Sequence, residues 1–175
     1  RDLLQEMQAV EEGFGADGRS YLFHHLLGRG ARVAIPEAAL ARYDDNIRTH
    51  LAAMNRGRAA PITLRYFQHL AALYTEIVLD RLFHTPQQLL ADLNAFVAAR
   101  NASRLPGEVQ DEPFTLAGLN KLAFWMATGS GKTLLLHLNL RQFLHYNRAP
   151  LDNILLITPN EGLSEQHLDE LAASG

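Results

Sequence analysis

The feature that most constrains this chain is a glycine-rich turn between an apolar run and a leucine-rich segment. The turn reads Met126-Ala127-Thr128-Gly129-Ser130-Gly131-Lys132-Thr133. It matches the template G-x-x-x-x-G-K-[ST] at its last three positions, and Met126 replaces the first glycine. The run 122–126 before it predicts a strand, and residues 132–146 after it predict a helix. This order predicts a phosphate-binding loop, although a chance Gly-Ser-Gly turn before Lys-Thr would look the same.

The residue types of this turn suit a bound triphosphate. Gly129 and Gly131 let the backbone turn tightly, so that consecutive N–H groups face one point. The following helix presents its N-terminus, which favours anions. Lys132 would reach the β- and γ-phosphates of ATP, and the Thr133 hydroxyl would ligate Mg²⁺. We therefore predict Lys132 and Thr133 as catalytic residues, ATP and Mg²⁺ as cofactors, and a nucleotide site made of Thr128, Gly129, Ser130, Gly131, Lys132 and Thr133.

Residues 1–100 carry apolar side chains at helical spacing and are predicted to be a mostly helical region. The clearest pattern follows Pro36 and consists of Leu40, Tyr43, Ile47, Leu51 and Met54. A second stripe consists of Leu64, Phe67, Ala71, Tyr74, Val78 and Leu82. Further helices are predicted over residues 2–12, 20–27 and 86–97. Residues 101–115 carry two prolines, a glycine and three acids, which predicts a loop or domain boundary.

Residues 116–175 follow a different pattern. The apolar runs 122–126 and 154–158 alternate with predicted helices over 132–146 and 163–173. Continuously apolar strands joined by helices are typical of a parallel sheet that is covered on both faces. The predicted fold class is therefore α/β, a helical N-terminal region followed by the incomplete start of a parallel sheet.

Composition narrows the classes of function. The chain has no cysteine, which excludes disulfides, thiolate zinc sites and cysteine nucleophiles. No uncharged apolar run approaches the roughly 18 residues of a membrane helix. From Arg19 to Arg65 there are eight arginines against three acids. This stretch is either a nucleic-acid face or a solvated helical surface.

The segment Phe124–Thr133 resembles motif I of superfamily 2 helicases and translocases. It is most similar to the motor subunits of type I and type III restriction enzymes and related defence proteins. Residues 157–166 (ITPNEGLSEQ) resemble motif Ia of that superfamily. The resemblance implies a RecA-like ATP-binding lobe that begins in residues 116–175. It also implies nucleic-acid contacts by Thr158, Pro159, Asn160 and Gln166, although a loop capped by Asn160 or Ser164 would share part of the pattern.

Residues 64–68 (LRYFQ) resemble the stretch before motif I in which a glutamine reads the adenine edge. An amide suits this task because it carries both a donor and an acceptor. Gln68 is therefore either a further nucleotide-binding residue or a solvent-facing residue on a helix.

The resemblance implies an ATP-dependent translocase or helicase that moves on nucleic acid, most simply duplex DNA, in restriction or defence. It implies a cytoplasmic protein with no membrane association, and modification or specificity subunits as possible partners. The family's Walker B acids and arginine finger are expected beyond Gly175, so these 175 residues alone are expected not to hydrolyse ATP. The alternatives are another P-loop NTPase that does not act on nucleic acid, and a non-catalytic module that contacts DNA or protein.

Overall fold

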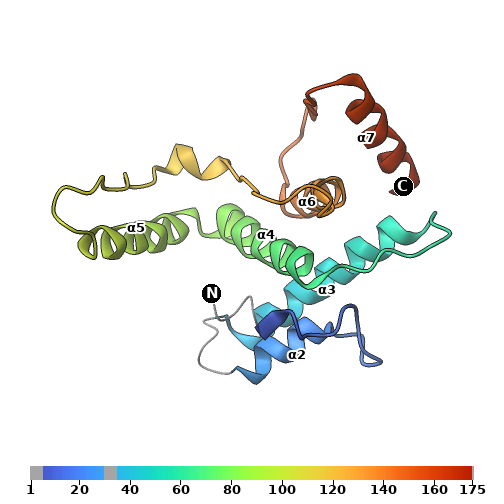
Figure 1. Ribbon diagram of the computed structural model, residues 1–175, viewed down its shortest axis with the longest axis horizontal. Helices are drawn as coiled ribbons and strands as arrows, with labels where there is room; N and C mark the ends of the chain where they lie inside the picture. The colour runs from blue at the N-terminus through green and yellow to red at the C-terminus, as the bar shows by residue number, and fades with distance from the viewer. Residues whose placement is uncertain (1–5, 30–34, 175) are drawn as a thin grey trace.

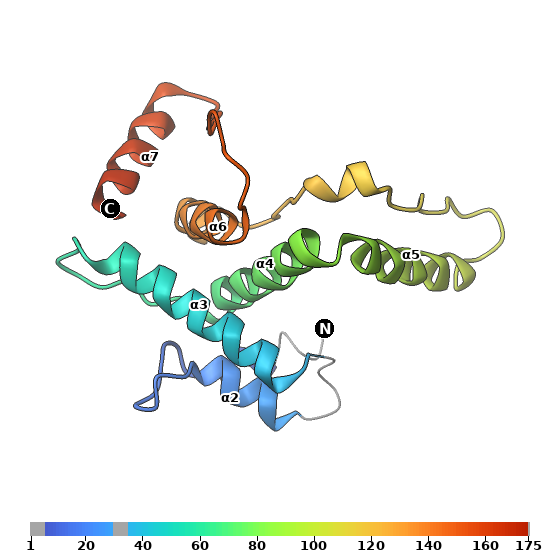
Figure 2. The same ribbon diagram turned by 180° about the vertical axis from the view of Figure 1, so that it is seen from behind.

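The computed structural model describes residues 6–29 and 35–174, and these residues are organised by helices (Figure 1). The helices that pack around the core are α2 (Tyr21–Gly28), α3 (Glu37–Asn55), α4 (Tyr66–His84) and α6 (Lys132–Tyr146). From the end of α4, α5 (Pro86–Ala102) projects away from the core, and the short helix η2 (Leu116–Asn120) lies beside it. The last helix, α7 (Glu161–Ser174), stands apart near the end of α3, as the opposite view also shows (Figure 2).

The apolar stripe of α3 forms the centre of the core, as its spacing predicts. Ile47 and Met54 have no exposed surface, and Leu40 is 3% exposed. Burying a side chain of this size stabilises the fold by roughly 1.5–3 kcal/mol. Pro36 directly precedes the helix, where its missing N–H removes no helical hydrogen bond.

The buried face of α4 differs from the predicted stripe. Tyr74 is 53% exposed, whereas Thr75 and Glu76 are almost completely buried. The reason is that α4 packs between two neighbours, α3 and α6, and therefore buries a broad, partly polar surface. An apolar stripe indicates the buried face of a helix only when the helix has a single buried side.

A buried carboxylate joins α3, α4 and α6. Glu76 has no exposed surface and accepts hydrogen bonds from Gln142 Nε2 at 2.7 Å, Tyr146 Oη at 2.7 Å and Asn46 Nδ2 at 2.9 Å. Three donors satisfy a charge that would otherwise be costly to bury. Burial, together with this carboxylate, raises the pKa of Tyr146 far above its usual value. These hydrogen bonds fix the position of α6 along α4.

The predicted parallel sheet is wrong for the residues that the structure describes. Residues 122–126 and 154–158 are irregular and pair with no neighbouring strand within 6–29 and 35–174. Several of their side chains lie in solvent, with Trp125 91%, Leu155 82% and Ile157 82% exposed. An apolar run indicates what a segment tends to bury, but a strand forms only where a second extended backbone satisfies its N–H and C=O groups. Neither segment meets such a partner in the described part of the chain, so the α/β class does not hold there.

Most predicted helices are confirmed, with shifts at their ends. The helix after the glycine turn runs from Lys132 to Tyr146, as predicted, and the last helix begins at Glu161 instead of Leu163. The helix predicted over residues 2–12 is largely wrong, because residues 8–12 form turns and irregular structure, while residues 2–5 lie outside the described part. No described helix is both long and apolar enough to cross a membrane.

The boundary segment 103–115 is held along α5 by two asparagines. Asn101 donates to the carbonyl of Asp111 at 2.8 Å and accepts from its N–H at 2.9 Å. Asn94 donates to the carbonyl of Phe114 at 3.1 Å and accepts from its N–H at 2.7 Å. The loop predicted here is therefore fixed in place, because each side-chain amide satisfies both polar groups of one residue's backbone.

Candidate nucleotide-binding site

The glycine turn lies directly before α6 and adopts the tight geometry that its sequence predicts. Gly129 has φ +76° and Gly131 has φ +82°, both in the left-handed region. Ser130 closes the turn through its N–H and its hydroxyl, which both donate to the carbonyl of Ala127, at 3.3 Å and 2.6 Å. Gly131 is the N-cap of α6, so the turn lies at the positive end of that helix. The arrangement presents backbone N–H groups and a helix terminus to solvent, which suits an anion.

Lys132 bends back over the turn. Its Nζ donates to the carbonyl of Ala127 at 3.0 Å and lies 3.4 Å from that of Met126. These carbonyls are weak partners for an ammonium group, so a phosphate could replace them. Thr133 faces a hollow of about 470 Å³ that Lys132 also lines, together with Pro159. A threonine hydroxyl at this position is a suitable oxygen ligand for Mg²⁺ held by a nucleotide.

Gln68 is buried against the glycine turn. Its side chain is 6% exposed, its Nε2 donates to the carbonyl of Ser130 at 2.8 Å, and its Oε1 accepts from the N–H of Arg65 at 2.9 Å. A Cβ atom added to Gly131 would collide with Gln68 Nε2. Gln68 is thus not solvent-facing, and in this structure it supports the loop from α4.

The segment predicted to contact nucleic acid caps the start of α7. Asn160 Oδ1 accepts from the N–H of Leu163 at 3.0 Å. The Thr158 hydroxyl lies 2.5 Å from that of Ser164 and donates to the carbonyl of Asn160 at 3.0 Å. Pro159 lines the same hollow as Lys132 and Thr133, whereas Gln166 is exposed on α7. The structure therefore brings Pro159 to the hollow beside the glycine turn and leaves Gln166 away from these hydrogen bonds.

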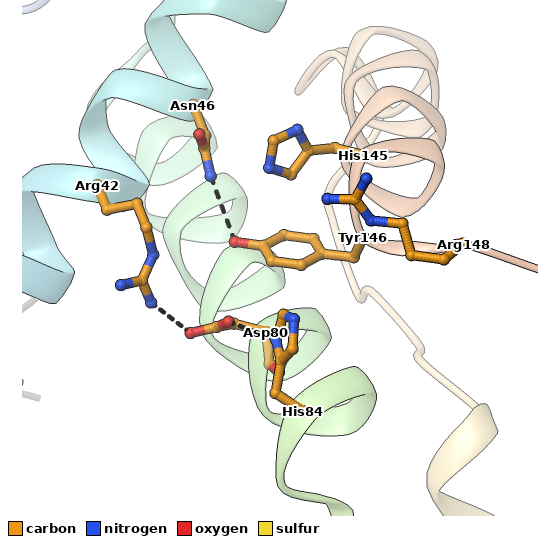
Figure 3. Close-up of a pocket in the computed structure, with 7 residues that line it drawn as sticks. All are labelled: Arg42, Asn46, Asp80, His84, His145, Tyr146 and Arg148. Carbon is orange, nitrogen blue, oxygen red and sulfur yellow. Dashed lines mark hydrogen bonds and ion pairs between the residues drawn. The ribbon is translucent and has the colours of Figure 1, made fainter.

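A second hollow, of about 380 Å³, lies at the opposite end of α6 (Figure 3). Its polar groups are largely engaged with one another. Asp80 accepts from Arg42 at 2.6 Å and from Tyr43 at 2.6 Å, and it lies 2.8 Å from His84 Nδ1. Partial burial opposes ionisation of Asp80, but these contacts outweigh it and keep the pKa of Asp80 below its usual value. Its residues therefore serve to connect α3, α4 and α6.

Most arginines of the stretch 19–65 make contacts within the chain. The ion pairs join Arg19 to Asp45 at 3.0 Å, Arg48 to Asp45 at 3.2 Å, Arg42 to Asp80, Arg29 to Glu6, and Arg58 to Glu170. Among the described residues, Arg56 and Arg65 form no ion pair, and Arg32 lies outside the described part. This arrangement favours the solvated-surface interpretation of the stretch.

Two features near the turn have no clear signal in the sequence. An apolar hollow of about 380 Å³ adjoins the turn and is lined by Phe67, Ala71, Phe124, Trp125, Met126, Ala127 and Ser130. His137 and His167 meet between α6 and α7, with Nε2 and Nδ1 3.2 Å apart. Their separation of thirty residues gives no periodic pattern to detect. Among the described residues, no three histidines or acids gather as a metal site would require.

Comparison with known proteins supports one family. Residues 66–175 match the family described as "Type III restriction enzyme, res subunit". No curated protein and no solved structure matches the chain. The matched range begins at α4 and includes Gln68, the glycine turn and the start of α7, which are the segments that carry the resemblance to restriction motors. The chain therefore belongs to the type III restriction enzyme res-subunit family.

Proposed function

We propose that the chain binds Mg·ATP through the glycine turn at the start of α6, as part of a motor that couples ATP hydrolysis to movement along duplex DNA. The observation that carries this proposal is the left-handed geometry of Gly129 and Gly131 at the N-terminus of α6, with Lys132 bent over the turn. The groups of the turn fit this ligand. The backbone N–H groups and Lys132 would bind the phosphates, and Thr133 would bind the metal ion. Membership of the res-subunit family supports an ATP-dependent, helicase-like role in restriction.

Each residue of the site has a separate task in this proposal. The turn holds the phosphates by backbone N–H groups, which need no rearrangement when the ligand arrives. Lys132 exchanges the carbonyls of Ala127 and Met126 for phosphate oxygens, which is favourable because the new partners are charged. Gln68 keeps the turn in place by its hydrogen bond to Ser130.

The test of nucleotide binding uses the only two lysines of the chain. We expect Lys132→Ala to weaken Mg·ATP binding at least tenfold, which corresponds to about 1.4 kcal/mol. Lys121→Ala is the matched control, because Lys121 is exposed and lies before the turn. Calorimetry should show binding by the native chain and by the Lys121 variant. Equal affinities of the native chain and the Lys132→Ala variant would exclude the site.

The proposed contact with DNA is tested separately. Thr158 and Asn160 lie at the N-terminus of α7, where main-chain N–H groups can reach a backbone phosphate. We expect Gln166→Ala combined with Asn160→Ala to weaken binding of a fluorescent duplex, measured by anisotropy. Gln110→Ala is the control, since Gln110 is exposed in the segment along α5. This contact would be contradicted if the Asn160→Ala, Gln166→Ala double variant bound the duplex as tightly as the Gln110→Ala control and the native chain.

A further inference from the structure

Polar contacts join α7 to α6 and to the segment that follows α3. Arg58, which follows α3, pairs with Glu170. His137 of α6 meets His167 of α7, with Nε2 and Nδ1 3.2 Å apart. The helix stands apart from the core in both views (Figures 1 and 2), and its Leu168 is 65% exposed. These two pairs therefore contribute to the position of α7.

The two buried imidazoles share one hydrogen bond, in which one ring donates and the other accepts. His137 is 2% exposed and His167 is 8% exposed, so water does not replace either partner. One nitrogen must donate and the other must accept, because two protonated nitrogens 3.2 Å apart would repel each other. The second nitrogen of His137, Nδ1, is buried without a hydrogen-bond partner. The favoured tautomer of His137 has its proton on Nε2, since the tautomer with its proton on Nδ1 would bury an N–H that has no acceptor.

The charged groups around the pair disfavour a proton on His137. Burial is the main cause that lowers its pKa, and the neighbouring His167 lowers it further. Arg58 and Arg141 act in the same direction, whereas Glu170 opposes them. Glu170 is already paired with Arg58, so its charge is largely compensated. Lys132 adds a further cation at the hollow that His167 lines.

We propose that His137 and His167 form a proton-operated latch, which holds α7 against α6 while both imidazoles are neutral and releases it when His137 becomes charged. Release follows because a second proton on His137, at Nδ1, would create a charged ring whose new N–H is buried without an acceptor. Moving the ring into water removes this cost, because water solvates the charge and accepts from the N–H.

The latch regulates the two segments that it joins. His137 lies on the helix that begins at the glycine turn, and His167 lies on the helix that begins after Thr158 and Asn160. Opening it would separate Pro159 from the hollow that Lys132 and Thr133 line. This consequence rests on the proposed function, but the latch itself does not. Its test is therefore a distance measurement that needs neither nucleotide nor DNA.

The experiment measures the position of α7 with spin labels. The chain has no cysteine, so Ala52→Cys on α3 and Ala172→Cys on α7, both at exposed positions, give a single labelled pair. We expect a narrow distance distribution at about pH 7.5 and loss of at least about half of that population at about pH 5, with EDTA present throughout. Circular dichroism at both pH values checks that the core helices remain folded.

Two further variants make the result specific. His137→Gln with His167→Asn keeps an amide donor where Nε2 stands and a carbonyl acceptor where Nδ1 stands, but cannot take up a proton. We expect the narrow distribution to persist in it at both pH values. His145→Gln, at an exposed position on the same helix, should respond to pH like the native chain. A native distribution that does not change with pH, or a pH response that survives in the double variant, would overturn the latch.

Discussion

Gln68 Nε2 on α4 donates to the carbonyl of Ser130 at 2.8 Å, which ties the glycine turn to the helical core. The same side chain accepts from the N–H of Arg65 at 2.9 Å, so both ends of the amide are fixed. A loop that is to present N–H groups to a ligand needs such support, because those N–H groups cannot also hold the loop together by pairing within it. The contact explains why a polar residue occupies a buried position at the start of α4.

Replacing Gln68 tests whether it supports the loop or reads the base. We expect Gln68→Ala to weaken ATP and GTP binding by the same factor, about 5- to 30-fold, since a lost buried hydrogen bond costs on the order of 1–2 kcal/mol. Gln110→Ala, at an exposed position, is the control and should leave both affinities unchanged. If the variant loses only its preference for ATP over GTP, the side chain acts on adenine.

Gly131 is the second test of the loop geometry. We expect Gly131→Ala to abolish measurable Mg·ATP binding, because φ is +82° there and the new Cβ would collide with Gln68. The left-handed conformation alone costs a non-glycine residue roughly 1–2 kcal/mol. Gly28→Ala is the matched control, since a Cβ there meets nothing within 4 Å. If the Gly131→Ala variant bound nucleotide as tightly as the Gly28→Ala control, the loop would not need this conformation.

Stability should fall in mild acid because of buried histidines. Burial lowers the pKa of His69 to about 4 from 6.5, although Asp44 nearby opposes the shift. Between these values an unfolded His69 binds more protons than a folded one, so its contribution to the free energy of unfolding decreases as pH falls from about 7 to about 4 and then levels off. His69 alone accounts for up to about 3 kcal/mol of that decrease. Urea denaturation at several pH values measures it.

A variant separates His69 from the other histidines. We expect His69→Gln to be less stable than the native chain at neutral pH, since it disturbs a buried site, but to show a shallower loss of stability in acid. His24→Gln is the control, because the His24 side chain is 49% exposed. An acid dependence in His69→Gln as steep as in the native chain would assign the effect to other groups. His50, whose pKa burial also lowers to about 4, is the next candidate.

The arginine-rich stretch should contribute little to DNA binding. Each lost phosphate contact reduces the slope of log affinity against log salt by about 0.9 for duplex DNA. We expect Arg42→Gln, Arg48→Gln and Arg56→Gln together to leave the slope unchanged, because Arg42 and Arg48 pair with Asp80 and Asp45. Fluorescence anisotropy at several salt concentrations measures the slope. A reduction by two or more would restore these arginines as a nucleic-acid face.

The sequence by itself determined the local structures. The spacing of Leu40, Ile47 and Met54 specified α3, because periodicity depends only on the chain. The turn at Gly129 and Gly131 was also predictable, since glycine is the residue that enters the left-handed region without strain. The limits of α6, Lys132 and Tyr146, follow from that turn and the leucine-rich pattern after it.

Only the tertiary structure decided which segments meet. No local pattern could place Gln68 under Ser130 or bring His137 to His167, because such contacts depend on how α4, α6 and α7 pack. The same limit explains the wrong prediction of strands at 122–126 and 154–158. Their apolar residues were visible in the sequence, but a strand also requires a paired backbone, and pairing is a property of the fold and not of the segment.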